Sequence, residues 1–177
     1  MRTLLLATLL LLSACGKEVV SRSVFVEKAV VDQDMTCDVF DVPAGPIDFS
    51  ALSSLGQIQV DRLDIPLTTG SFKPFLNTSF SSKLDNFGID CNATLHIKES
   101  NTYTLYLSSD DGSNLFLDKT LVIDNSGDHA PLKKSFSTFL LAGRYPLRIN
   151  YYNRTGQKQL ILSIKKTGSS FEEAAQF

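Results

Sequence analysis

The sequence of 177 residues contains no tryptophan, only two histidines and only three cysteines. It also lacks an apolar stretch of about 20 residues, the length that a helix needs to cross a bilayer. The formal net charge is −2 and no run of like charges occurs, which argues against a nucleic-acid partner. No Gly-x-Ser-x-Gly motif is present to hold a serine nucleophile. These absences argue against membrane-spanning, nucleic-acid-binding and serine-hydrolase proteins.

The N-terminus has the order of an export signal. Arg2 supplies a positive charge, residues 4–12 form an apolar run, and small residues precede Cys15. A buried core helix is the alternative interpretation of this run. Because Leu-Ser-Ala-Cys15 resembles the bacterial lipobox, we expect residues 1–14 to be a signal peptide and Cys15 to carry lipid. Gly16 is similar to the residue after the cysteine in outer-membrane lipoproteins, which predicts a lipid anchor in the cell envelope, at the outer membrane.

The rest of the sequence predicts one domain of ordinary size. Its expected parts are a lipidated tether at 15–33 with room for a strand at 24–31, a β module at 34–168, and a short tail at 169–177 that frays from Glu172.

Two cysteines remain after lipidation, Cys37 and Cys91. Outside the cytoplasm, two leftover cysteines form a disulfide more often than a metal site. We therefore expect a Cys37–Cys91 bond.

Apolar and polar residues alternate along much of the module, as in strands with one buried face. The clearest alternations are Leu95/Ile97, Tyr103/Leu105/Leu107, Leu115/Leu117, Leu121/Ile123, Phe139/Leu141, Tyr145/Leu147/Ile149/Tyr151 and Leu160/Leu162/Ile164. No stretch after Cys15 has the pattern of an amphipathic helix, and residues 48–87 are expected to form short strands and long loops. Short strands at regular spacing predict an all-β fold, an antiparallel β-barrel or sandwich.

Residues 103–125 are the most informative segment. Taken by itself, Asp111-Gly112 indicates a hairpin turn, because glycine accepts positive φ. Taken in their order along the chain, however, several residues here resemble the motif of the protective-antigen fourteen-kilodalton module. This is a β-barrel family found in toxins, in fungal flocculins and adhesins, and in some glycosidases. The matching residues are Tyr103, Ser109-Asp110-Asp111-Gly112, Leu115, Val122-Ile123-Asp124-Asn125 and His129, followed by the later strand Gly143–Tyr152. The absence of tryptophan departs from the family pattern.

The resemblance implies that Asp110 and Asp111 are joined by a cis peptide bond and hold a calcium ion. Consecutive side chains of a strand point to opposite faces, so neighbouring carboxylates need an unusual backbone to hold one ion. Calcium takes roughly six to eight oxygen ligands, so a second loop must contribute. The resemblance places Asn153 there as a ligand, with Asn150 as the alternative. The ion would then coordinate sugar hydroxyls, which makes a glycan the expected partner.

Three further side chains have an expected place. By its position in the alternation, Tyr152 lies on the face of its strand opposite the apolar residues, so we expect a partly exposed tyrosine on the sheet. The alternative is that its ring lies beside the sugar site. His96 is expected to face solvent, and His129 to brace its turn.

The sequence thus predicts a lipid-anchored, non-catalytic module that binds carbohydrate through calcium. Adjacent Asp110 and Asp111 do not have the spacing of the two carboxylates of a glycosidase, which lie about 5–9.5 Å apart across a cleft. The alternative is a structural or protein-interaction lipoprotein that keeps the barrel without a working sugar site. The lack of tryptophan and the short second loop favour this alternative.

Overall fold

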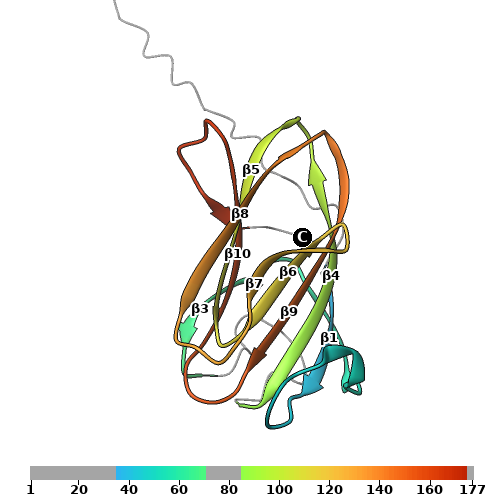
Figure 1. The fold of residues 1–177 in the computed structure, drawn as a ribbon, viewed down its shortest axis with the longest axis vertical. Coiled ribbons are helices and arrows are strands. Elements are labelled where there is room, and N and C mark those ends of the chain that lie inside the picture. Colours follow the sequence, from blue (N-terminus) through green and yellow to red (C-terminus); the bar gives the residue numbers. More distant parts are fainter. Residues whose placement is uncertain (1–34, 71–84, 175–177) are drawn as a thin grey trace, which may run out of the picture.

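The strands pair into two antiparallel β-sheets in the computed structural model, which describes residues 35–70 and 85–174 (Figure 1). Cys15 and the strand expected at 24–31 lie outside the described residues. No helix in the described part is long and apolar enough to cross a membrane. A single short 3-10 turn, η1 (Phe49–Ala51), is the helical element among these residues.

The first sheet has six strands. Their spatial order is β2 (Gly56–Val60), β1 (Met35–Asp41), β4 (Phe87–Ile97), β9 (Gly143–Asn153), β6 (Ser113–Leu117) and β7 (Thr120–Asn125). The long strands β4 and β9 form its centre, paired without interruption from Phe87↔Asn153 to Ile97↔Gly143.

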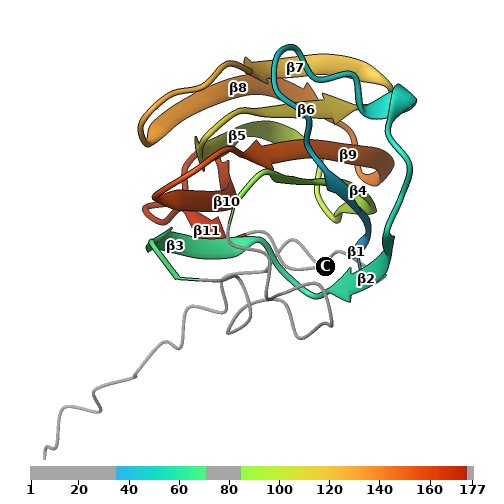
Figure 2. The same cartoon turned by 90° about the horizontal axis from the view of Figure 1, so that it is seen from below.

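The second sheet is built around two long strands. Its order is β11 (Glu173–Ala174), β10 (Lys158–Lys166), β5 (Asn101–Asp110) and β8 (Leu132–Leu140), and β3 (Asp64–Thr68) also pairs with β10. In Figure 2 the two sheets lie side by side, with β8, β5, β10 and β3 on one side and β7, β6, β9, β4, β1 and β2 on the other.

The core lies between the sheets. Leu105 and Leu107 of β5 and Ile149 and Tyr151 of β9 are almost completely buried. These residues carry the predicted alternation, so one face of each strand packs inward and stabilises the fold by about 25 cal/mol for each Å² of apolar surface removed from water. The two sheets stay separate within the described residues. Of the two architectures expected, the sandwich is therefore confirmed and the closed barrel is not formed.

In two strands the buried residues differ from those that the alternation predicted. Leu121 is 46% exposed while Ile123 is buried, because the β6–β7 register shifts between Leu115 and Phe116. On β8 the buried residue is Leu140, which lies between the exposed Phe139 and Leu141.

The expected frayed tail is partly ordered. Glu173–Ala174 pairs with β10, and the Glu172 carboxylate accepts hydrogen bonds from Lys133 Nζ at 2.6 and 2.8 Å. Ser163 also donates to this carboxylate. The end of the chain is thereby attached to both β8 and β10.

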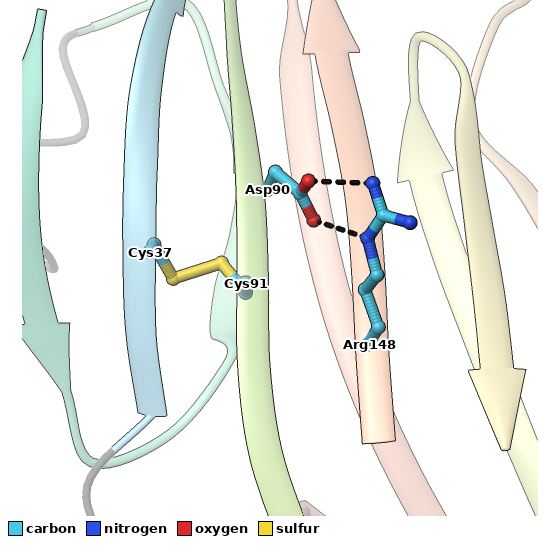
Figure 3. The surroundings of a disulfide bond; sticks show 4 residues. All are labelled: Cys37, Asp90, Cys91 and Arg148. Atoms are coloured by element: carbon cyan, nitrogen blue, oxygen red, sulfur yellow. Dashed lines mark hydrogen bonds and ion pairs between the residues drawn. A yellow bond between two sulfur atoms is a disulfide. The ribbon is translucent and has the colours of Figure 1, made fainter. Parts of the chain in front are cut away.

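The expected disulfide is present and joins neighbouring strands. Cys37 of β1 lies directly opposite Cys91 of β4, and both are fully buried (Figure 3). On the outer face of the same sheet, Arg148 of β9 donates two hydrogen bonds to Asp90 of β4, at 2.8 and 2.7 Å (Figure 3). The disulfide therefore holds β1 to the central strands, and the bidentate ion pair links the central strands to each other.

One end of the sandwich gathers four connections from distant parts of the sequence. They follow β1 (residues 42–48), β5 (111–112), β7 (126–131) and β9 (154–157). Because β1 runs toward this end, its first residue, Met35, lies about 20 Å away from it along the strand, at roughly 3.3 Å per residue.

Replacing both cysteines, Cys37→Ala with Cys91→Ala, should lower the free energy of unfolding by about 4 kcal/mol. The disulfide joins two residues with a sequence separation of 54 and so restricts the unfolded chain. Without the bond the unfolded chain has more conformational entropy, which favours unfolding. Urea unfolding of the oxidised wild type and the double variant measures the difference. A loss below about 1 kcal/mol would contradict it.

Candidate functional site

Asp110 and Asp111 lie where the chain passes from one sheet to the other. Asp110 ends β5 in the second sheet, and Ser113 begins β6 in the first, so β5 and β6 do not form a hairpin. The hairpin-turn interpretation of Asp111-Gly112 is therefore wrong. The peptide bond between the two aspartates is cis, as the resemblance implied. Both side chains are buried, with exposed fractions of 6% and 8%.

Gly112 is required by close packing and not by positive φ. Its φ is not in the left-handed region, but a Cβ at this position would lie 2.7 Å from Tyr152 Cζ and 2.9 Å from Gly127 O. The Tyr152 N–H also donates to Gly112 O at 2.9 Å. The backbone after the aspartates therefore lies directly beneath the tyrosine ring, where no side chain fits.

The end of β9 reaches the aspartate pair from the other sheet. The Arg154 N–H donates to Asp111 Oδ2 at 2.8 Å, and the Tyr151 hydroxyl donates to Asp110 O at 2.8 Å. Asn153, between these two residues, is fully buried. The loop that the sequence predicted as the second contributor is thus in contact with the pair.

Burial and neighbouring charges act together on the Asp110 carboxyl group. Burial, reinforced by the negative charge of Asp111, raises the pKa of the Asp110 carboxyl above its ordinary value. The charges of His129 and Lys158 act in the opposite direction. Two buried carboxylates side by side therefore favour a nearby cation.

A groove of about 770 Å³ is lined by Gly112, the residue after the pair, whereas the two aspartates are not part of its lining. Asn150 and Tyr152 lie on its floor, on the outer face of the six-stranded sheet. Asn150 is 5% exposed, and its Nδ2 has no hydrogen-bond partner within the described part of the chain. Segments 44–49 and 126–128 contribute the walls. Gly112 and Arg154 belong to both the groove lining and the surroundings of the aspartates.

Tyr152 is less exposed than expected. It is 8% exposed, and its hydroxyl donates to Asp128 Oδ1 at 2.8 Å. Burial, followed by this hydrogen bond, raises the pKa of the phenol well above its ordinary value. The expected partly exposed sheet tyrosine is therefore not observed, and the ring lines the groove instead.

Arg154 connects the groove walls and was not singled out from the sequence. Its guanidinium donates to the carbonyl oxygens of Pro43 and Gly45, and its Nε lies 3.5 Å from Asp128 Oδ1. The same group lies 5.2 Å above the Tyr152 ring. In the sequence, the only indication of its role was its position directly after Asn153. The order of residues alone does not reveal which backbone carbonyls an arginine reaches.

His129 braces the turn after β7, as expected. Its ring nitrogens lie 2.9 Å from the carbonyl oxygens of Asn125 and Ala130. Asn125 in turn donates to Ser109 Oγ at 2.9 Å, next to the aspartate pair. His96 is half-exposed on β4, in agreement with a solvent-facing position.

The donor set near the aspartates consists of hard oxygens. Nowhere in residues 35–70 and 85–174 do three or more His, Cys, Asp or Glu side chains gather to hold a metal ion. The pair therefore needs amide or backbone oxygens to complete the coordination of an ion. Buried Asn153, next to the residue that binds Asp111, fits this requirement.

Comparisons with known proteins agree with the arrangement. Residues 75–173, more than half of the chain, match the family model described as the PA14 domain. No curated protein sequence matches the chain.

Solved structures share the fold. A PA14 sugar-binding domain from an RTX adhesin superposes with a TM-score of 0.63 at 15% identity, over 81% of this chain and 95% of that domain. The epithelial adhesin 9 A domain from Candida glabrata, in complex with Galb1-3GlcNAc, gives 0.62 at 12% identity, over 81% and 86%. An anti-sigma factor domain-containing protein gives 0.66 at 21% identity, over 80% of this chain but 46% of its own length. At such identities the likeness shows the fold alone.

Gly112→Ala should destabilise the protein by about 1–3 kcal/mol, because the methyl group would overlap the Tyr152 ring and the Gly127 carbonyl. Gly143→Ala is the matched control: its nearest atom would be 3.8 Å away, at ordinary contact distance. Thermal unfolding of both variants compares them. Equal melting temperatures would contradict the packing argument.

Proposed function

The chain belongs to the PA14 domain family, and from this premise we propose that it is a non-catalytic module that binds carbohydrate through a calcium ion held by Asp110 and Asp111. One observation carries the proposal. Two buried, adjacent carboxylates lie against the loop after β9, and both the residue that follows them, Gly112, and the residue that binds Asp111, Arg154, line a groove of about 770 Å³.

Asp110, Asp111 and Asn153 would hold the ion. Their oxygens are of the hard type that calcium prefers, and the buried negative charge would be neutralised on binding. When bound, calcium would supply open coordination positions for two neighbouring hydroxyl groups of a sugar. The chain's own residues hold the pair in place: the Tyr151 hydroxyl donates to the backbone carbonyl of Asp110, and the Arg154 backbone N–H donates to the Asp111 carboxylate.

The groove offers the chemistry that a sugar requires. The Asn150 amide supplies polar atoms, and the Tyr152 ring and Phe49 add aromatic surface. Polar groups orient sugar hydroxyls, whereas aromatic surface packs against the apolar faces of the ring. Two solved domains of the same fold are described as sugar-binding or as a sugar complex, which supports the same ligand class.

The direction of β1 is compatible with a lipid anchor at Cys15 in a cell envelope, at the outer membrane. The chain enters β1 at Met35, on the side away from the groove. Residues 15–34 can span at most about 65 Å when extended. An anchor at Cys15 would thus allow the groove to face away from the membrane.

The alternative, a structural or protein-interaction lipoprotein without a working sugar site, rests on two observations. The chain contains no tryptophan to stack on a sugar ring. The guanidinium of Arg154 is already engaged by the carbonyls of Pro43 and Gly45, so its donors are directed at the protein.

Calcium should raise the melting temperature of the wild type, because a ligand that binds only the native state stabilises it. At a hundredfold excess over Kd the gain is about 2.7 kcal/mol. Asp111→Asn should abolish the shift, whereas Asp118→Asn, a matched charge change in the β6–β7 turn, should retain it. Differential scanning fluorimetry with calcium and with chelator measures this. A wild type that does not respond to millimolar calcium contradicts the ion site.

A glycan array should give a signal with calcium that disappears with chelator. Asn150→Ala should weaken binding by about tenfold, the cost of roughly one hydrogen bond, and leave the calcium-induced melting shift intact. Asn92→Ala, on the same outer face but in the part of β4 paired with Arg148, should bind like the wild type. No glycan signal under either condition would favour the alternative function.

A further inference from the structure

Lys158 is a buried cation at the first position of β10. Its side chain is fully buried, and its Nζ donates to Gly156 O at 3.0 Å. Lys158 lies on the same face of β10 as Leu160 and Leu162, which pack into the core. A lysine at such a position usually extends its ammonium group to water, but here that group remains buried.

A buried ammonium group needs a negative partner. An isolated charge in the interior is strongly unfavourable, and one carbonyl oxygen does not neutralise it. Among the described residues no carboxylate is close enough to Lys158 for a direct ion pair. Residues 71–84, which follow the strand paired with Lys158 at Thr68, contain no aspartate or glutamate. Within the described residues, the counter-charge therefore acts from beyond ion-pair distance.

The sheet register places the aspartate pair beside Lys158. Gln159 of β10 pairs with Asp110 of β5, so the backbone of the preceding residue, Lys158, lies next to the point where the cis-linked aspartates end β5. In a buried environment the attraction between an ammonium group and a carboxylate acts over several ångströms, because little water screens it.

We propose that Lys158 is the resident counter-ion of the Asp110–Asp111 pair, and that a divalent cation at the pair binds against its repulsion. The first part depends only on the placement of the charges, whereas the second rests on the proposed calcium site. The formal charge of the two carboxylates together with the ammonium is −1, against −2 for the carboxylates alone. The native fold therefore partly neutralises the pair in the absence of an ion, and calcium affinity is lower than two isolated carboxylates would give.

A double-mutant cycle in chelator tests the counter-ion. The variants are Lys158→Met, Asp110→Asn and their combination, measured by urea unfolding. Lys158→Met removes the counter-charge of both carboxylates, and Asp110→Asn removes one of the two charges that compensate Lys158. The double variant should therefore be more stable than additivity predicts, by about tenfold or more in the unfolding equilibrium constant. Lys158→Gln serves in place of Lys158→Met if the latter does not fold. Lys166→Met, at the other end of the same strand, is the control and should show less than twofold coupling to Asp110→Asn.

Calcium titration of the same proteins tests the competition. Lys158→Met should bind calcium about tenfold or more tightly than the wild type, and Lys166→Met within twofold of it. Coupling below twofold in the cycle overturns the counter-ion. Coupling with no calcium binding in any variant supports the counter-ion and overturns the calcium site instead. Calcium binding of equal strength in wild type and Lys158→Met overturns the competition.

Discussion

The passage of the chain between the two sheets at Asp110–Gly112 is the constraint on which the rest of the site depends. β5 and β6 belong to different sheets, so the connection must turn out of one layer into the other within two residues. It does so beneath the Tyr152 ring, where only a glycine fits, and through a cis peptide bond that follows a buried strand. The packing of the sandwich thus brings two carboxylates to a place where water cannot fully solvate them.

The groove follows from this crossing. Because Gly112 carries no side chain, Tyr152 can lie flat against the backbone and direct its hydroxyl toward Asp128. Arg154 then covers the tyrosine ring and binds the carbonyls of Pro43 and Gly45. Segments that are more than 100 residues apart in sequence are joined in this way. A change in the crossing would therefore disturb the aspartates and the groove walls together.

The sequence predicted those features that depend on pattern. The inward strand faces of Leu105/Leu107 and Ile149/Tyr151 and the Cys37–Cys91 bond are confirmed, because alternation and cysteine number are local or countable properties. Features that depend on tertiary packing were misjudged or missed. Asp111-Gly112 has the composition of a hairpin turn, but the sheet to which a strand belongs is not encoded in its turn residues. The burial of Tyr152 and the bonds of Arg154 depend on loops that meet only in the folded chain.

Lys158 shows how a departure from pattern can indicate function. In the series Lys158, Leu160, Leu162 the first member has inward parity but a charged side chain, and the structure keeps it buried. A core position that could hold leucine would be more stable without the desolvation of an ammonium group, unless a nearby negative charge compensates it. The cis-linked aspartates are such a charge, and they too would be unfavourable alone. The three side chains therefore explain each other's presence: the acidic pair makes the buried lysine tolerable, and the lysine offsets part of the formal charge of the pair.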